Sequence, residues 1–210
     1  MKKFLSLICA CMMILCPLSS CAEKNPSENE SSTIQELDEA VLKPIHDYLD
    51  GYNAKDAELV LSSFVPQLLI SEMKEKGTYE NEIERVKGNI DATFELWEEN
   101  YGADSSISFG GEVSNSTLSE EYLELASKYF ELTFYDLETK IELEQGYEVS
   151  YTYTIKGEHA STSDTQKACH VKVRDGEWVL LFCDAETLES FRDTPDEVET
   201  GESSETDTTE

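Results

Sequence analysis

A histidine with a carboxylate nearby is the one combination in this sequence that could carry out acid–base chemistry. His46 and Asp50 are four residues apart in a segment whose apolar residues recur at helical spacing, so both side chains would lie on one helical face. An imidazole beside a carboxylate can move protons near neutral pH. Such a pair is more often a solvated contact on a helix surface, so His46 and Asp50 are only weak catalytic candidates.

The other two histidines form no catalytic or metal-binding pattern. His159 lies in the polar stretch 157–166 and is expected to be exposed. His170 alternates with Ala168 and Lys172 in a predicted strand, and we expect it on the open surface of a sheet. The chain has no H-E-x-x-H zinc motif, no G-x-S-x-G elbow, no P-loop and no dinucleotide fingerprint. We therefore expect no metal and no cofactor, and enzymatic activity is the less favoured alternative.

Four of the six cysteines lie within the first 21 residues. Two lysines precede an apolar run over residues 4–15, which has the length of a secretory signal and is too short to span a bilayer. The residues that follow, LSSC at 18–21, resemble the lipobox of bacterial lipoproteins. That resemblance implies a signal peptide over residues 1–20, cleavage between Ser20 and Cys21, and acyl chains such as palmitate on the Cys21 sulfur.

The lipoprotein resemblance implies an extracytoplasmic protein anchored to the cell membrane, or to the outer membrane if the organism is Gram-negative. The alternative is an ordinary secretory signal with a chance cysteine. Composition divides the remaining chain. Residues 21–32 are predicted to be the lipidated cysteine and a flexible linker, 33–192 a single domain, and 193–210 a disordered acidic tail.

The formal net charge is −29. Removal of two of the 16 basic residues with the signal leaves 14 against 45 acidic residues, a charge of −31. Nucleic acid is excluded as a partner because binding it requires a basic face. An anionic membrane surface would repel the domain as well, which leaves the lipid as the attachment. The favoured interpretation of this acidity is that it keeps the protein soluble. The alternative is that it attracts a cationic protein or peptide. The acidic residues do not have the spacing of an EF-hand loop, so they do not indicate a Ca²⁺ site.

Cys169 and Cys183 flank the last predicted hairpin and could form a disulfide in an exported protein. A two-residue turn would place them on opposite faces of the sheet. A three-residue loop with Gly176 as a G1 bulge would place both on one face, offset diagonally. The alternative is that the two cysteines are small apolar residues of the core.

The pattern of apolar residues predicts an α+β domain in which helices precede and then alternate with strands. A capping box at Thr33–Glu36 predicts the start of the first helix, which Pro44 would kink or split. The run of strands at the end favours an antiparallel sheet. Further helices are expected at 57–64, 68–76, 80–101 and 120–132 and a last helical turn at 185–191, with strands at 106–113, 146–158, 167–173 and 178–183.

The stretch IHDYLDGYNAKDAELVLSSFVP at 45–66 and the hairpin VRDGEWVLLF at 173–182 resemble the NTF2-like α+β cone, in which N-terminal helices pack on a curved, mostly antiparallel sheet. The resemblance implies a pocket at the wide end of the cone, which in some members binds small molecules and in others catalyses isomerisation or hydrolysis. The Tyr-rich strand 146–158 could line such a pocket, but core packing is the favoured interpretation. The positions in this chain that match the first motif are Asn53, Asp56, Phe64 and Pro66.

Three functions follow as hypotheses. The favoured one is a surface-tethered lipoprotein that binds a small ligand or a protein partner without catalysis. The second is a pocket enzyme of the NTF2-like isomerase or hydrolase type that uses His46 with an acid. The third is a structural envelope lipoprotein without a ligand. Fold alone does not choose among them.

Overall fold

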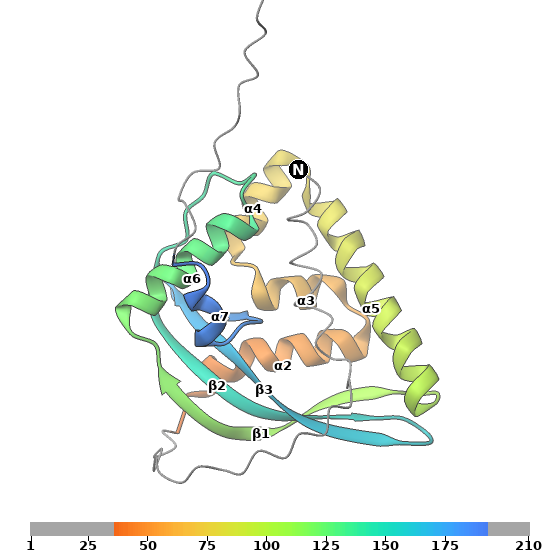
Figure 1. Ribbon diagram of the computed structural model, residues 1–210. Coiled ribbons are helices and arrows are strands. Elements are labelled where there is room, and N and C mark those ends of the chain that lie inside the picture. Colours follow the sequence, from red (N-terminus) through yellow and green to blue (C-terminus); the bar gives the residue numbers. More distant parts are fainter. Residues whose placement is uncertain (1–35, 193–210) are drawn as a thin grey trace, which may run out of the picture.

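A computed structural model describes residues 36–192 as helices packed on a sheet (Figure 1). The helices are α2 (Glu39–Ala54), α3 (Ala57–Phe64), α4 (Gln67–Lys76), α5 (Tyr79–Tyr101), α6 (Glu120–Thr133) and α7 (Ala185–Glu189). The strands are β1 (Ser106–Thr117), β2 (Leu143–Lys156), β3 (Ser161–Val173) and β4 (Trp178–Leu181).

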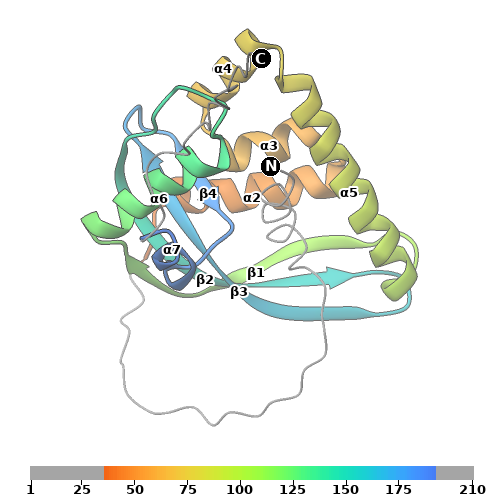
Figure 2. The same cartoon turned by 45° about the horizontal axis from the view of Figure 1, so that its top comes forward.

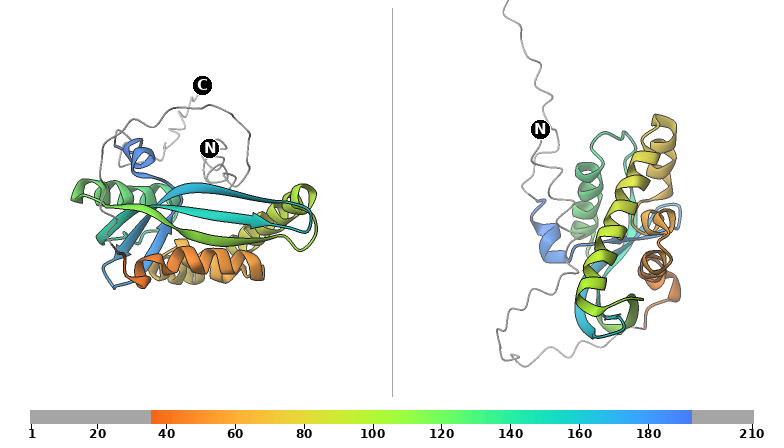
Figure 3. Two further views of the ribbon diagram at one scale, coloured as in Figure 1. Left: turned by 90° about the horizontal axis from the view of Figure 1, so that it is seen from below. Right: turned by 90° about the vertical axis from the view of Figure 1, so that its right-hand side faces the viewer.

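The strands form one sheet in the order β1-β2-β3-β4, and every neighbouring pair is antiparallel. The helices α2, α3, α4 and α5 lie on one side of the bent sheet and α6 and α7 on the other (Figure 3). Figure 2 shows α6 and α7 together at one end of the sheet and α5 at the other. The predicted α+β class, with N-terminal helices against an antiparallel sheet, is therefore confirmed.

The helix boundaries follow from the capping side chains. Asp38 accepts a hydrogen bond from the Ala40 amide, and Asp56 accepts from the Glu58 and Leu59 amides, so α2 and α3 each begin after an aspartate. The predicted start of the first helix at the Thr33–Glu36 capping box is wrong, because Glu36 lies outside the helix and Asp38 caps it. Pro44 lies inside a continuous α2 and does not split it.

Asn53 joins the end of α2 to the outer edge of the sheet. Its Nδ2 donates to the Ile107 carbonyl over 2.7 Å, and its Oδ1 accepts from the Ile107 amide over 2.9 Å. Because β1 is an edge strand, the Asn53 amide takes the place of a neighbouring strand at this position. The pairing of β1 with β2 shifts between Phe109 and Gly111, which places a bulge at Gly110.

The core lies mainly between the sheet and α2, α3 and α5. One face of β2 is turned into the core, where Tyr147, Val149, Tyr151, Tyr153 and Ile155 are all buried. The Tyr-rich strand therefore packs in the core. The opposite face is also covered at one end, where Leu118 and Leu123 lie within 3 Å of the position that a Cβ on Gly146 would take.

Candidate functional site

The predicted pair His46 and Asp50 lies near the exposed edge of the sheet. The His46 ring is half-buried and meets Phe109 of β1 edge-on, with ring centroids 4.7 Å apart. Asp50 is exposed, and within residues 36–192 no hydrogen bond or ion pair joins it to His46. The carboxylate next to His46, Asp47, forms an ion pair with Lys43 instead. An acid–base role for His46 and Asp50 stays a prediction.

Aromatic side chains fill the space between α2 and the sheet. The Tyr48 ring lies 4.8 Å from that of Tyr52 and 4.6 Å from that of Phe182, and Tyr52 contacts Trp97 of α5. Burial, with a smaller effect of Tyr52, raises the pKa of Tyr48 well above 10, and burial also raises that of Tyr151. Both tyrosines stay protonated at neutral pH, so they can donate hydrogen bonds but cannot act as bases.

His170 is fully buried, so its predicted place on an open sheet surface is wrong. It lies on the face of β3 that α2 covers, and its Nδ1 is 2.7 Å from the Val41 carbonyl oxygen in the first turn of that helix. Its Nε2 is buried and has no hydrogen-bond partner within the described part of the chain. Burial lowers the pKa of His170 to about 4. The ring is therefore neutral at pH 7.

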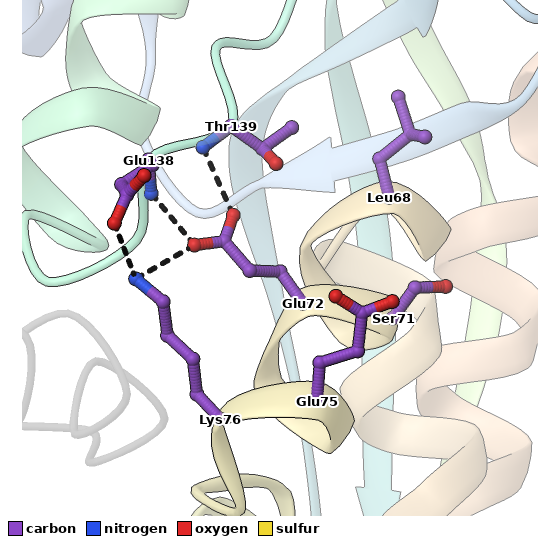
Figure 4. A pocket seen from close by; sticks show the side chains of 7 residues that line it. All are labelled: Leu68, Ser71, Glu72, Glu75, Lys76, Glu138 and Thr139. Atoms are coloured by element: carbon purple, nitrogen blue, oxygen red, sulfur yellow. Dashed lines mark hydrogen bonds and ion pairs between the residues drawn. The ribbon is translucent and has the colours of Figure 1, made fainter.

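A shallow, open depression of about 500 Å³ lies between α4 and the segment 134–142 (Figure 4). In Figure 4, Glu72 and Lys76 of α4 reach toward Glu138 and Thr139. The side chains that line it are acidic, basic, hydroxyl and aliphatic: Leu68, Ser71, Glu72, Glu75, Lys76, Glu138 and Thr139.

Glu72 holds the 134–142 segment against α4. Its two carboxylate oxygens accept the amides of Glu138 and Thr139 over 2.7 and 2.9 Å, and Lys76 lies 2.8 Å from one of them. Lys76 also donates to the Asp136 carbonyl over 2.8 Å. The spacing of Glu72 and Lys76 in the sequence indicates at most an ion pair along a helix. Nothing in it identifies the partner segment more than 60 residues away.

The electrostatics of this depression suit binding better than proton transfer. The hydrogen bond from Lys76, together with those from Thr139 and Glu138, lowers the pKa of Glu72 to about 2. Glu72 raises the pKa of Lys76 in turn. A carboxylate and an ammonium that both keep their charge at neutral pH can bind ions or polar groups, but neither is poised to exchange a proton.

Cys169 and Cys183 are buried thiols in the structure and are not joined to each other. The Val173 amide donates to the Glu177 carbonyl and Gly176 has a φ of 95°, so the hairpin has the three-residue loop with a bulge at Gly176. Cys169 pairs with Leu181, and its amide donates to the Cys183 carbonyl over 2.9 Å. The cysteines are therefore apolar core residues in this structure, and the disulfide is the alternative that alkylation would test.

The lipidation and cleavage positions, Cys21 and Ser20, lie outside the described residues, as do the linker and the acidic tail. Across residues 36–192, no helix has the length and hydrophobicity needed to cross a membrane. The same residues contain no group of three or more His, Cys, Asp or Glu side chains that could hold a metal ion.

Comparison of the chain with protein-family models, with curated proteins and with solved structures finds no match. The resemblance to the NTF2-like cone therefore stays a prediction from the two sequence motifs, and the structure shows an α+β domain.

Proposed function

We propose that the chain is a lipid-anchored extracytoplasmic protein whose domain, an NTF2-like cone, binds a small ligand or a cationic protein without catalysing a reaction. One observation carries the anchor: a basic start, an apolar run of signal length and the residues LSSC follow one another in the order that lipoprotein signals require. The helices on one side of a bent antiparallel sheet, with Trp178 after the last tight turn, support the cone.

The anchor is tested by lipid labelling in cells. The full chain, expressed in a bacterium fed an alkyne-tagged fatty acid, is expected to carry the label and to lose it in Cys21→Ser. Cys16→Ser is the matched control, because this cysteine lies in the part that is removed and its loss should leave labelling unchanged. A label that persists in Cys21→Ser, or a mature N-terminus without lipid, would overturn the anchor.

Charge supports a cationic partner. A formal net charge of −29 attracts basic proteins at low salt, and this attraction weakens as salt screens it. The test is thermal unfolding of the mature protein with an oligolysine and with an oligoglutamate of equal length, in 20 and 150 mM salt. We expect only oligolysine to raise the melting temperature. No shift with oligolysine in either salt would rule out this partner class.

A structural role without a ligand is the second candidate, and one observation favours it. The space between α2 and the sheet holds packed aromatic side chains, including Tyr48, Tyr52 and Tyr151, which are buried. A cone filled in this way has its core where a ligand would otherwise sit. Failure of the cationic probe, together with failure of a small-molecule library to protect the domain against heat, would favour this role.

A further inference from the structure

His170 connects two parts of the chain that lie far apart in sequence. The ring is completely buried between β3 and the first turn of α2, and its Nδ1 lies 2.7 Å from the carbonyl oxygen of Val41, 129 residues away. A carbonyl oxygen can only accept a hydrogen bond, so Nδ1 carries the proton. In the neutral ring Nε2 then bears a lone pair, and this atom has no partner among the described residues.

A second proton on this ring would be poorly accommodated. It would attach to Nε2 and create a buried N–H donor without an acceptor, in addition to a buried positive charge. The hydrogen bond from Nδ1 to the Val41 carbonyl favours the charged ring, but burial outweighs it, and the side chains around the ring do not offset the charge either. On α2 the nearest titratable side chain is His46, on β2 the cross-strand neighbour is Tyr147, and on β4 it is Leu180. On β3 itself Lys172 shares this face and pairs with Glu144.

The first turn of α2 covers the ring and lacks one of the usual helix hydrogen bonds. Pro44 has no amide hydrogen, so the Ala40 carbonyl lacks its usual partner within the helix. Residues 39–43 are otherwise held by the Asp38 cap, through the Ala40 and Val41 amides, and by the Val41 side chain, which is buried in the core. Beyond Pro44 the helix is fixed in the core by buried Tyr48, Leu49 and Tyr52. Lifting residues 39–43 would expose the ring and leave the rest of α2 packed.

We infer that His170 and Val41 form an acid-released latch, in which the neutral ring holds the first turn of α2 against β3 and the protonated ring releases it. The low pKa of His170, about 4 against about 6.5 for an exposed histidine, agrees with a latch that is closed at neutral pH. By linkage, protonation favours the released form by about 20-fold at pH 5 and about 100-fold at pH 4, relative to pH 7.

Hydrogen exchange of the mature protein tests the latch. Amides of residues 40–43, corrected for intrinsic exchange rates, are expected to lose protection between pH 7 and pH 4, while amides of residues 48–54 in the same helix keep it. His170→Asn places an amide N–H near the position of Nδ1 but cannot titrate, so its first turn should show the same protection at both pH values. His159→Asn, which changes an exposed histidine, should behave as the wild type.

Two results would overturn the latch. One is full protection of residues 40–43 at pH 4 in the wild type. The other is the same loss of protection in His170→Asn as in the wild type. If His170→Asn does not fold, nitrogen NMR of the wild-type ring decides: we expect the proton on Nδ1 at pH 7 and titration below pH 5. A proton on Nε2, or titration near pH 6.5, would refute the latch.

Discussion

The double hydrogen bond of Asn53 gives the sharpest test of how the helical layer is attached to the sheet. Its amide donates to the Ile107 carbonyl over 2.7 Å and accepts from the Ile107 amide over 2.9 Å. Ile107 is only 2% exposed, whereas Asn53 is exposed, so water can partly replace the two hydrogen bonds when the Asn53 side chain is removed. Each bond contributes about 1 kcal/mol net, and we therefore expect Asn53→Ala to lower the free energy of unfolding by about 2 kcal/mol.

Asn53→Asp distinguishes the geometry from simple loss of a side chain. The aspartate keeps the shape and can still accept from the Ile107 amide, but it places a negatively charged oxygen against the Ile107 carbonyl where a donor is required. We expect Asn53→Asp to be at least as destabilising as Asn53→Ala, although it removes no heavy atoms. For a domain of this size, about 2 kcal/mol lowers the melting temperature by roughly 4–8 °C.

Urea unfolding followed by tryptophan fluorescence measures both variants, since buried Trp97 lies next to Tyr52 in the same region. Asn100→Ala is the control, because the Asn100 amide makes one exposed bond to the Leu96 carbonyl of its own helix. Its loss should change stability by less than about 0.5 kcal/mol. If Asn53→Asp matches the wild type, or if both Asn53 variants match Asn100→Ala, the proposed edge pairing is wrong.

Three further predictions follow from side-chain contacts and from the space around two glycines. Glu72→Gln should speed hydrogen exchange of the Glu138 and Thr139 amides, whereas Glu75→Gln in the same depression should not. Because the folded-state pKa of Glu72 is lowered to about 2, the stabilisation that its carboxylate gives is present above pH 4.5 and is lost as the pH falls toward 2. Gly51→Ala should destabilise the domain by about 1–3 kcal/mol, because the new Cβ would lie 2.7 Å from Val60 Cγ2. Gly88→Ala should stabilise the domain by about 0.5–1 kcal/mol, because no atom lies within 4 Å of its Cβ position. Equal effects of the two variants in urea unfolding would contradict this prediction. Alkylation of the unfolded, unreduced protein should add label to both Cys169 and Cys183, and labelling only after reduction would show a disulfide.

Alternation along a strand predicts which residues share a face, but not which face is covered. The pattern correctly places Tyr147, Val149 and Tyr151 together on β2, and all three are buried. It also places His170 on the face opposite Cys169, and that separation holds. The wrong prediction is that the face carrying His170 is open to solvent. Helix α2 lies over that face, and α6 and α7 lie over part of the other, so both His170 and Cys169 are buried. Burial of this kind depends on contacts between distant segments.

The same limit explains the candidate sites. Local spacing places His46 and Asp50 on one helix, but the half-buried ring packs against Phe109 of β1, a contact that no local pattern contains. Asn53 is identified by its place in a family-like motif, and its role becomes visible only when Ile107 lies beside it. Turn chemistry is more local, which is why the three-residue loop with Gly176 at its bulge is among the predicted alternatives.

The acidity of the chain also has a structural use that net charge does not reveal. A solvated carboxylate contributes mainly to solubility, and most of the 45 acidic residues can be read in that way. Within residues 36–192, six acidic residues instead accept hydrogen bonds from backbone amides either at a helix start or between distant segments. Reversing the charge of an exposed acid should therefore be tolerated, whereas the same change at any of these six leaves amides without an acceptor and brings a cation next to them. The six are Asp38, Asp56 and Asp184 at helix starts and Glu72, Glu148 and Glu177 between segments.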